Sequence, residues 1–162
     1  MPDGHAPAEA VKPLLLICWY SATGHNRALA RSAYAGARQV PGCEVRIRAA
    51  TRVQVEEFAA ANAWIFVAPE NFGQLCGGLR MMFERLYYPL ETALQGRPYA
   101  TITGCGNDGR GAVRDIDRIC AGWRLKRVAE PLYSRGELLP PTAQSARELG
   151  EALATGLADG IF

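Results

Sequence analysis

Short apolar runs alternate with amphipathic stretches from residue 13 to the end of the chain. Three runs are apolar throughout, which is typical of strands buried on both faces: residues 14–19, 63–68 and 99–103. Two runs are more polar, because residues 44–48 alternate apolar and charged side chains and Pro131 interrupts residues 128–133. Apolar side chains at helical spacing predict a helix after each run, over residues 26–40, 53–61, 77–88, 112–122 and 142–157.

Five strand–helix units in succession predict an α/β fold: a three-layer, doubly wound sandwich around a five-stranded parallel sheet. The three fully apolar strands belong in the centre of the sheet. The second strand carries Arg46 and Arg48 and the fifth carries Pro131, features that are tolerated at a sheet edge. The expected strand order is therefore 2-1-3-4-5.

Composition bounds the number of domains and the kinds of partner. The 162 residues, 49% of them apolar, fit a single domain, expected over residues 13–162 behind a loose N-terminal arm over residues 1–12. The 18 basic and 16 acidic residues leave a formal net charge of +2, and the arginines are scattered rather than massed. This balance gives no general field for nucleic acid or an acidic membrane, so neither is expected as a partner.

Cysteine usage and hydropathy bear on the compartment. The five cysteines have no CxxC spacing, which argues against a disulfide framework or a zinc site, and Cys18 and Cys120 lie in apolar patterns where we expect them to pack. No stretch reaches the ~18 continuous apolar residues of a transmembrane helix. Residues 1–12 also lack the pattern of a secretory signal. We therefore expect a cytoplasmic protein without membrane insertion.

The candidate chemistry lies in three loops that follow the three central strands. In doubly wound sheets, ligands bind beyond the carboxyl ends of the strands, where the strand order reverses. The first loop leads into a helix and contains Ser21, Thr23 and Gly24. Free N–H groups and the helix dipole make a phosphate cradle at such a point, although Ser21 or Thr23 could equally cap the helix.

The second and third loops are rich in glycine. Residues 69–78 include one aromatic side chain, Phe72, and could wall a flat ring; the alternative is an ordinary loop with Phe72 in the core. Residues 104–111 hold four glycines, which implies that backbone approaches something closely. The third loop also matches the dinucleotide fingerprint GxGxxG, but it follows the fourth strand rather than the first. We assign it to the far side of the same site, with dinucleotide binding as the lesser alternative.

Several other chemistries find no support in the sequence. The chain lacks a nucleotide P-loop and a nucleophile elbow, and no cysteine is followed six residues later by arginine. The histidines are His5 and His25, and we expect His25 to donate to a phosphate or to solvate the helix start. Asp108 is expected to act as a polar turn residue. We assign no catalytic residue and no metal site.

At these loops the chain resembles FMN-binding proteins of the flavodoxin fold, in particular the small NAD(P)H-dependent FMN reductases and flavodoxin-like oxidoreductases. SATGHN (residues 21–26) is similar to their phosphate loop, PENFGQLCGGLRMMFERLYYPL (69–90) to their second flavin loop and its helix, and GCGNDGRGA (104–112) to their third loop. The resemblance implies FMN, with its phosphate on Ser21, Thr23, Gly24, His25 and Asn26. The isoalloxazine would lie between two loops that contribute Pro69, Glu70, Asn71, Phe72, Gly73, Gly104, Cys105, Gly106, Asp108 and Gly109.

The resemblance implies an oxidoreductase that takes hydride from NAD(P)H onto FMN and reduces a quinone, a flavin or another small acceptor. The alternative is a flavodoxin-type single-electron carrier that serves a redox partner protein. Such carriers are characteristically acidic, whereas this chain is nearly neutral. A third alternative is an interaction module of the same fold without flavin, because fold alone does not fix function. Formation of a homodimer is left open.

Overall fold

The computed structural model describes residues 10–162, so the expected arm over residues 1–12 lies mostly outside the described residues. The strands are β1 (Leu14–Trp19), β2 (Glu44–Ala49), β3 (Ala63–Asn71), β4 (Gln74–Leu75), β5 (Pro98–Cys105), β6 (Lys126–Arg127) and β7 (Leu132–Arg135). The helices are α1 (His25–Ala37), α2 (Val55–Ala60), α3 (Gly77–Tyr87), α4 (Arg110–Gly122) and α5 (Pro140–Ala158), with two 3₁₀ turns, η1 (Ala50–Arg52) and η2 (Tyr88–Leu90). Within residues 10–162 no helix combines the length and apolar character needed to cross a membrane.

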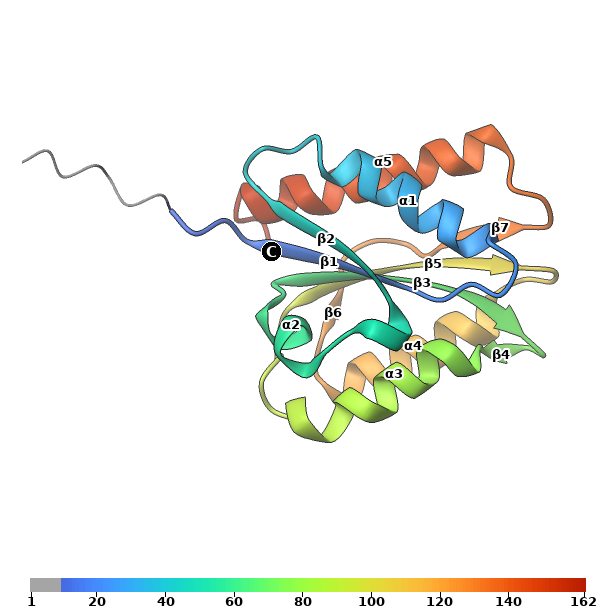
Figure 1. Ribbon diagram of the computed structural model, residues 1–162, viewed down its shortest axis with the longest axis horizontal. Coiled ribbons are helices and arrows are strands. Elements are labelled where there is room, and N and C mark those ends of the chain that lie inside the picture. Colours follow the sequence, from blue (N-terminus) through green and yellow to red (C-terminus); the bar gives the residue numbers. More distant parts are fainter. Residues whose placement is uncertain (1–9) are drawn as a thin grey trace, which may run out of the picture.

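The main sheet is parallel and has the order β2-β1-β3-β5, with β6 and β7 both pairing with β5 at the far edge (Figure 1). In the register of the central strands, Leu16 of β1 lies between Arg46 of β2 and Trp64 of β3. Because β5 is the fourth strand and β6 and β7 share the place of the fifth, the predicted order 2-1-3-4-5 is confirmed.

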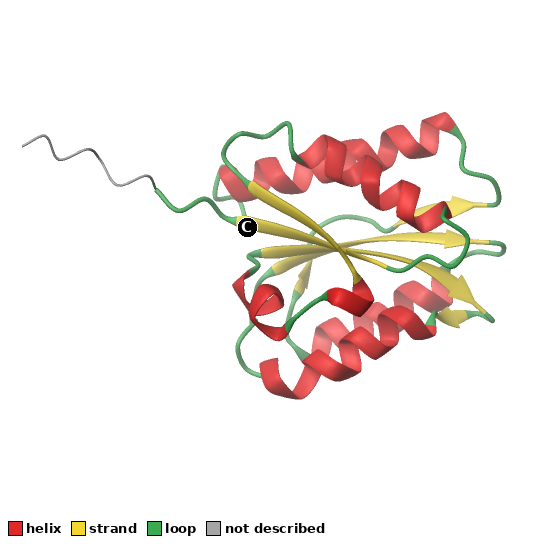
Figure 2. Cartoon of the chain, in the orientation of Figure 1, coloured by secondary structure: helices red, strands yellow, loops and turns green. Residues whose placement is uncertain are grey.

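Helices cover both faces of the sheet, which confirms the doubly wound, flavodoxin-like sandwich (Figure 2). On one face α1 and α5 bury Leu15 and Ile17 of β1. On the other face α2, α3 and α4 bury Leu16 and Cys18 of the same strand, together with a cluster of stacked aromatic rings that includes Phe58 and Trp64. Strand β1 is thus buried on both faces, as its continuous apolar run predicts.

The fifth strand differs from its predicted range of residues 128–133. It is split into β6 and β7, and residues 128–131 belong to no strand, although the Val128 N–H still donates to the Tyr99 carbonyl of β5 at 3.1 Å. Leu132 lies six positions after Lys126, whereas their partners Pro98 and Ile102 are four positions apart, so this edge has two extra residues between the paired positions. The physical reason is that Pro131 has no N–H to donate to a strand ladder. Proline is therefore tolerated here, at the edge of the sheet, where the ladder is interrupted.

Candidate functional site

The three loops singled out by composition meet in one cleft at the carboxyl ends of β1, β3 and β5. The cleft has a volume of about 290 Å³. Its lining comes from all three loops and from the turn after β7: Ala22, Thr23, His25, Asn26, Pro69, Glu70, Asn71, Gly104, Cys105, Gly106 and Gly136. A neighbouring hollow is lined by Glu70, Asn71, Phe72, Gly73, Gly106 and Asn107. The cleft lies beside the place where the chain order reverses between β1 and β3, as expected for this type of sheet.

The first loop delivers the N-terminus of α1 to the cleft. The N-cap residue is Gly24, whose φ of 95° is in the left-handed region that favours glycine. No side chain caps this helix, and its first turn contains no acidic residue. The hydroxyl oxygen of Ser21 accepts a hydrogen bond from the Gly24 N–H at 2.9 Å. This bond stabilises the turn before α1 and does not use an N–H group of the helix itself. The first N–H groups of α1 therefore remain available to an anion.

Asn26 holds the first and third loops together. It is buried, and its side-chain oxygen accepts a hydrogen bond from the Gly104 N–H at 2.9 Å. A Cβ atom on Gly104 would lie 2.8 Å from the Asn26 amide nitrogen and 2.9 Å from the His25 ring. The glycine at position 104 is therefore required by the close approach of α1 to the end of β5.

His25 is oriented by a partner that the sequence pattern did not reveal. Its Nε2 atom lies 2.8 Å from the hydroxyl of Ser134, a residue of β7 that is 1% exposed. The contact fixes the imidazole against the wall of the cleft. Ser134 lies 109 positions from His25, and only the pairing of β7 with β5 brings the two together.

The second loop is a β-hairpin rather than an irregular loop. Strand β3 continues to Asn71, and Asn71 pairs with Gln74 of the antiparallel strand β4. The two residues at the tip, Phe72 and Gly73, both have positive φ (54° and 71°), as a type I′ turn requires. A positive φ is rare for an aromatic residue. The alternative of Phe72 in the core is wrong, because its side chain is fully exposed at the tip of the hairpin.

Helix α4 braces this hairpin through two carboxylates. Glu70 accepts hydrogen bonds from the N–H groups of Gly111 (2.8 Å) and Ala112 (3.3 Å) in the first turn of α4. Asp115 on α4 accepts one from the Leu75 N–H (3.0 Å) and pairs with Arg80 at 2.9 Å. The first turn of α4 is thus supplied with an anion by the protein itself, in contrast to α1. This contrast disfavours the dinucleotide reading of the GxGxxG match, which needs a free helix N-terminus.

The third loop supplies a buried thiol and two turn contacts. Burial raises the pKa of the Cys105 thiol, with a smaller contribution from the nearby Glu70 carboxylate, so the group is neutral at pH 7. The Asp108 carboxylate accepts a hydrogen bond from the Arg110 N–H at 3.1 Å, which agrees with its expected role in a turn. Arg135 donates to the Asn107 carbonyl at 2.6 Å and ties the loop to β7.

Of the fifteen residues predicted for the site, nine line the cleft, and Phe72 and Gly73 line the neighbouring hollow. Ser21, Gly24, Asp108 and Gly109 shape the loops without lining either space. Sequence reasoning missed Ala22, Asn107, Gly136 and Ser134. For Ala22 and Asn107 the signal was their position inside the chosen loops. Gly136 follows from the general rule that the loop after each strand of such a sheet reaches the same edge, and Ser134 lies just before it in the chain, within β7.

Comparison with known proteins identifies the family. The family described as "NADPH-dependent FMN reductase" matches residues 38–136, more than half of the chain. The chain belongs to this family. The matched segment contains the second and third loops of the site and begins after the first. Membership confirms the resemblance that the sequence motifs indicated.

Two curated relatives match part of the chain. Both are named NAD(P)H dehydrogenase (quinone): that of Geobacter sulfurreducens is 29% identical and that of Geotalea uraniireducens 32% identical, each over 94 residues. Each match covers 43% of this member of the family and 46% of the relative, so it spans less than half the length of the curated relatives.

Solved structures agree with the fold. A flavodoxin from the domain Archaea has a TM-score of 0.79 at 14% identity and covers 89% of this chain and 98% of its own. A WrbA-like flavodoxin from Agrobacterium tumefaciens has a TM-score of 0.77 at 15% identity, with coverage of 92% and 99%. At these identities the comparison establishes the flavodoxin-like fold of this FMN reductase family member.

Proposed function

We propose that the cleft binds FMN and that the protein is an NAD(P)H-dependent oxidoreductase that reduces a quinone, a flavin or another small acceptor. The observation that carries the proposal is the meeting of three separate loops in one cleft beside an uncapped helix N-terminus. Family membership and the two quinone dehydrogenase relatives support the same reaction.

The residues of the first loop fit a phosphate group. The N-terminus of α1 offers uncapped N–H groups and the positive end of its dipole, with no carboxylate in the first turn to oppose an anion. A Cβ on Gly24 would meet no atom within 4 Å, so the space above the loop is open. Thr23 and His25 line this space and can donate hydrogen bonds to phosphate oxygens.

The other two loops fit a flat ring. The hairpin that carries Asn71 and Phe72 forms one wall, and backbone of Gly104 and Gly106 forms the other. These glycines keep the wall thin, and backbone groups of both loops can meet the polar edge of a ring. Because α4 braces the hairpin through Glu70, the wall is held in place before any ligand arrives.

FMN held by these residues would supply the redox chemistry, which is the transfer of a hydride (two electrons and one proton) from a nicotinamide. The chain's own residues bind and orient the cofactor. The cleft is small and open to the surface, so a nicotinamide and an acceptor would reach it from solvent. No proton donor is needed from a side chain, and the Cys105 thiol, whose pKa is raised by burial, stays neutral at pH 7.

The single-electron carrier alternative has less support. A carrier that docks on a partner protein is expected to surround its flavin with acidic groups. The one carboxylate that lines the cleft or the adjacent hollow is Glu70, and its charge is directed to α4 rather than to solvent.

The proposal is tested by reconstituting the purified protein with FMN and mixing it, without oxygen, with NADH or NADPH. We expect bound flavin with a visible spectrum, bleaching by one or both nicotinamides, and reoxidation by a benzoquinone or free flavin. A protein that stays colourless after soaking in FMN would overturn cofactor binding. Bound flavin that neither nicotinamide reduces would overturn the reductase and leave the electron carrier.

A further inference from the structure

A second and larger hollow lies on the other side of α1, at the open edge of the sheet. Its volume is about 630 Å³, within the usual range for sites of small organic ligands. It is bounded by the end of β1, the first three turns of α1, the end of β2 and η1. Its lining residues are Trp19, Arg27, Arg31, Tyr34, Ile47, Arg48, Ala49, Thr51 and Arg52. None of them belongs to the FMN cleft.

The lining of this hollow is strongly basic. Four of the nine residues are arginines and none is acidic, whereas the whole chain carries a formal net charge of only +2. Arg27 and Arg31 are four residues apart on α1, so their guanidinium groups lie on the same side of the helix and repel each other. The fold thus concentrates positive charge here that the sequence spreads over 26 positions.

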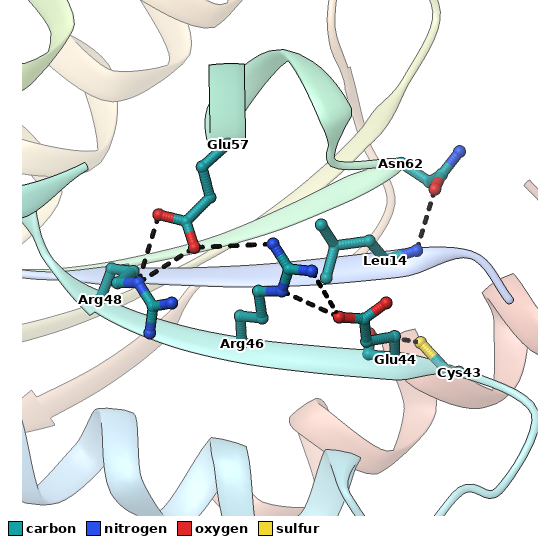
Figure 3. A network of polar contacts seen from close by, with 7 residues as sticks. All are labelled: Leu14, Cys43, Glu44, Arg46, Arg48, Glu57 and Asn62. Carbon is teal, nitrogen blue, oxygen red and sulfur yellow. Dashed lines mark hydrogen bonds and ion pairs between the residues drawn. The ribbon is translucent and has the colours of Figure 1, made fainter. Parts of the chain in front are cut away.

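Most of this charge is not neutralised by the protein. Glu57 on α2 pairs with Arg48 at 3.0 Å and, more distantly, with Arg46, and Figure 3 shows these arginines on β2 facing that carboxylate. Among the described residues, the side chains of Arg27, Arg31 and Arg52 form no ion pair. Guanidinium groups without an ion-pair partner suit phosphate, because each presents a planar fork of N–H donors.

The same hollow also contains aromatic surface. Trp19 and Tyr34 are half-buried along its wall, and the Arg27 guanidinium lies 5.7 Å from the centre of the Trp19 ring. Thr51 adds a hydroxyl group. A bare anion would fill little of this volume and would make no contact with the rings. A nucleoside phosphate would fill both parts of the hollow, with its base against the aromatic surface and its phosphate among the arginines.

We propose that the hollow bounded by α1, β2 and η1 binds a nucleoside phosphate. Arg27, Arg31 and Arg52 bind the phosphate, and Trp19 and Tyr34 contact the nucleoside. This ligand chemistry has two sources: the phosphate-bearing adenosine end of NADPH, or a separate nucleotide. The first source would rest on the function proposed above, and the second would not.

The test uses the full chain and titrates it with adenosine 2′,5′-bisphosphate, unphosphorylated adenosine and inorganic phosphate. Binding is measured by calorimetry and by fluorescence, since Trp19 lines the hollow whereas Trp64 and Trp123 are buried. We expect the bisphosphate to bind more tightly than adenosine or inorganic phosphate. Its affinity should fall as ionic strength rises. The double variant Arg27→Ala/Arg31→Ala should weaken it by about tenfold or more, because charged hydrogen bonds are lost.

The matched control is Arg118→Ala, which removes an exposed arginine of α4 that lines neither space. It should leave bisphosphate binding unchanged. Circular dichroism and FMN binding check that the double variant is folded and that its flavin cleft is intact. If the double variant loses bisphosphate binding but retains FMN, the two sites are shown to be independent. This proposal can therefore fail without the proposed function failing, and the reverse.

Steady-state kinetics then distinguish the two sources. If the phosphate belongs to NADPH, the double variant raises KM for NADPH and leaves KM for NADH unchanged. If the nucleotide is a separate ligand, neither KM changes although calorimetric binding is lost. The proposal is overturned if the wild-type chain does not bind the bisphosphate, if the double variant binds it equally well, or if inorganic phosphate binds as tightly.

Discussion

At the scale of single residues, the shape of the cleft proposed for FMN depends on a close approach at one glycine of the third loop. Gly104 is the clearest, because its missing side chain lets Asn26 and His25 approach the end of β5. The nearby Gly106 lines the same cleft, but a Cβ there would meet no atom within 4 Å. Packing therefore requires a glycine at position 104 but leaves room for a side chain at position 106.

We expect Gly104→Ala to weaken FMN binding and to lower the free energy of unfolding by about 1–3 kcal/mol, the usual cost of overpacking a tight site. The new methyl group would push Asn26 away and lengthen its hydrogen bond to residue 104. Urea unfolding and flavin titration measure the two effects. Gly106→Ala is the matched control and should change stability little. Equal effects of the two variants would show that the close approach at Gly104 is not a constraint.

Substitutions at Gly24, the N-cap of α1, test whether a charge at this position opposes the cofactor. Gly24→Asp should lower the free energy of unfolding by about 1 kcal/mol, because a φ of 95° is strained for a residue with a Cβ atom. It should weaken FMN binding by about tenfold or more, because its carboxylate competes with the phosphate for the same N–H groups. Flavin titration measures this loss.

Gly24→Asn is the matched control, since it has the same size and N-cap preference without the charge. It should retain FMN better than Gly24→Asp, and the difference should shrink as ionic strength rises. If both variants bind FMN as the wild-type chain does, the phosphate is not held at this loop.

At the scale of elements, the sequence pattern predicts the strands and helices whose positions depend on burial. It misses features that depend on hydrogen bonds between elements. The first four runs correspond to β1, β2, β3 and β5 and each amphipathic stretch to a helix, because apolar periodicity reports directly on which faces are covered. The fifth run, residues 128–133, forms a strand only at its end, in β7. The hairpin of β3 and β4 was not predicted. Its turn places Phe72 at positive φ, and its position is held by Glu70 and Asp115, contacts that span some 40 positions of sequence.

We expect Glu70→Gln to lower the free energy of unfolding by about 1 kcal/mol, because an anion at the N-terminus of α4 is replaced by a neutral amide. The variant should also loosen the hairpin and weaken FMN binding, although its side-chain oxygen can still accept a hydrogen bond. Urea unfolding and hydrogen exchange of the Gly111 and Ala112 amides measure the change. Glu84→Gln, at an exposed position of α3, is the control and should have little effect.

At the scale of the whole molecule, α1 divides two hollows, the cleft proposed for FMN and the basic hollow proposed for a nucleoside phosphate. Arginines that look scattered along the sequence gather on one side of that helix only because β1, β2 and η1 end beside it. Periodicity reveals which residues face inward, but not which exposed side chains from distant segments become neighbours. Charge clusters of this kind therefore require the structure.

The buried thiols give the whole molecule an expected response to pH. Burial raises the pKa of all five cysteines, and Cys18 and Cys120 are fully inaccessible. A thiol in the unfolded chain ionises near pH 8.5, at about its ordinary pKa. Below that pH the native and unfolded states bind the same protons, so stability is unaffected. Above it the unfolded state loses protons that the native state keeps, so the free energy of unfolding falls as pH rises.

Each thiol that stays protonated in the native state lowers the free energy of unfolding by about 1.4 kcal/mol per pH unit above that point. We therefore expect a steep loss of stability above about pH 9, measured by urea unfolding under reducing conditions. The variant Cys18→Ala/Cys120→Ala should be less stable at neutral pH, because it leaves small cavities, yet its stability should fall less steeply in alkali. Parallel slopes for the two proteins would show that these thiols do not govern the alkaline transition.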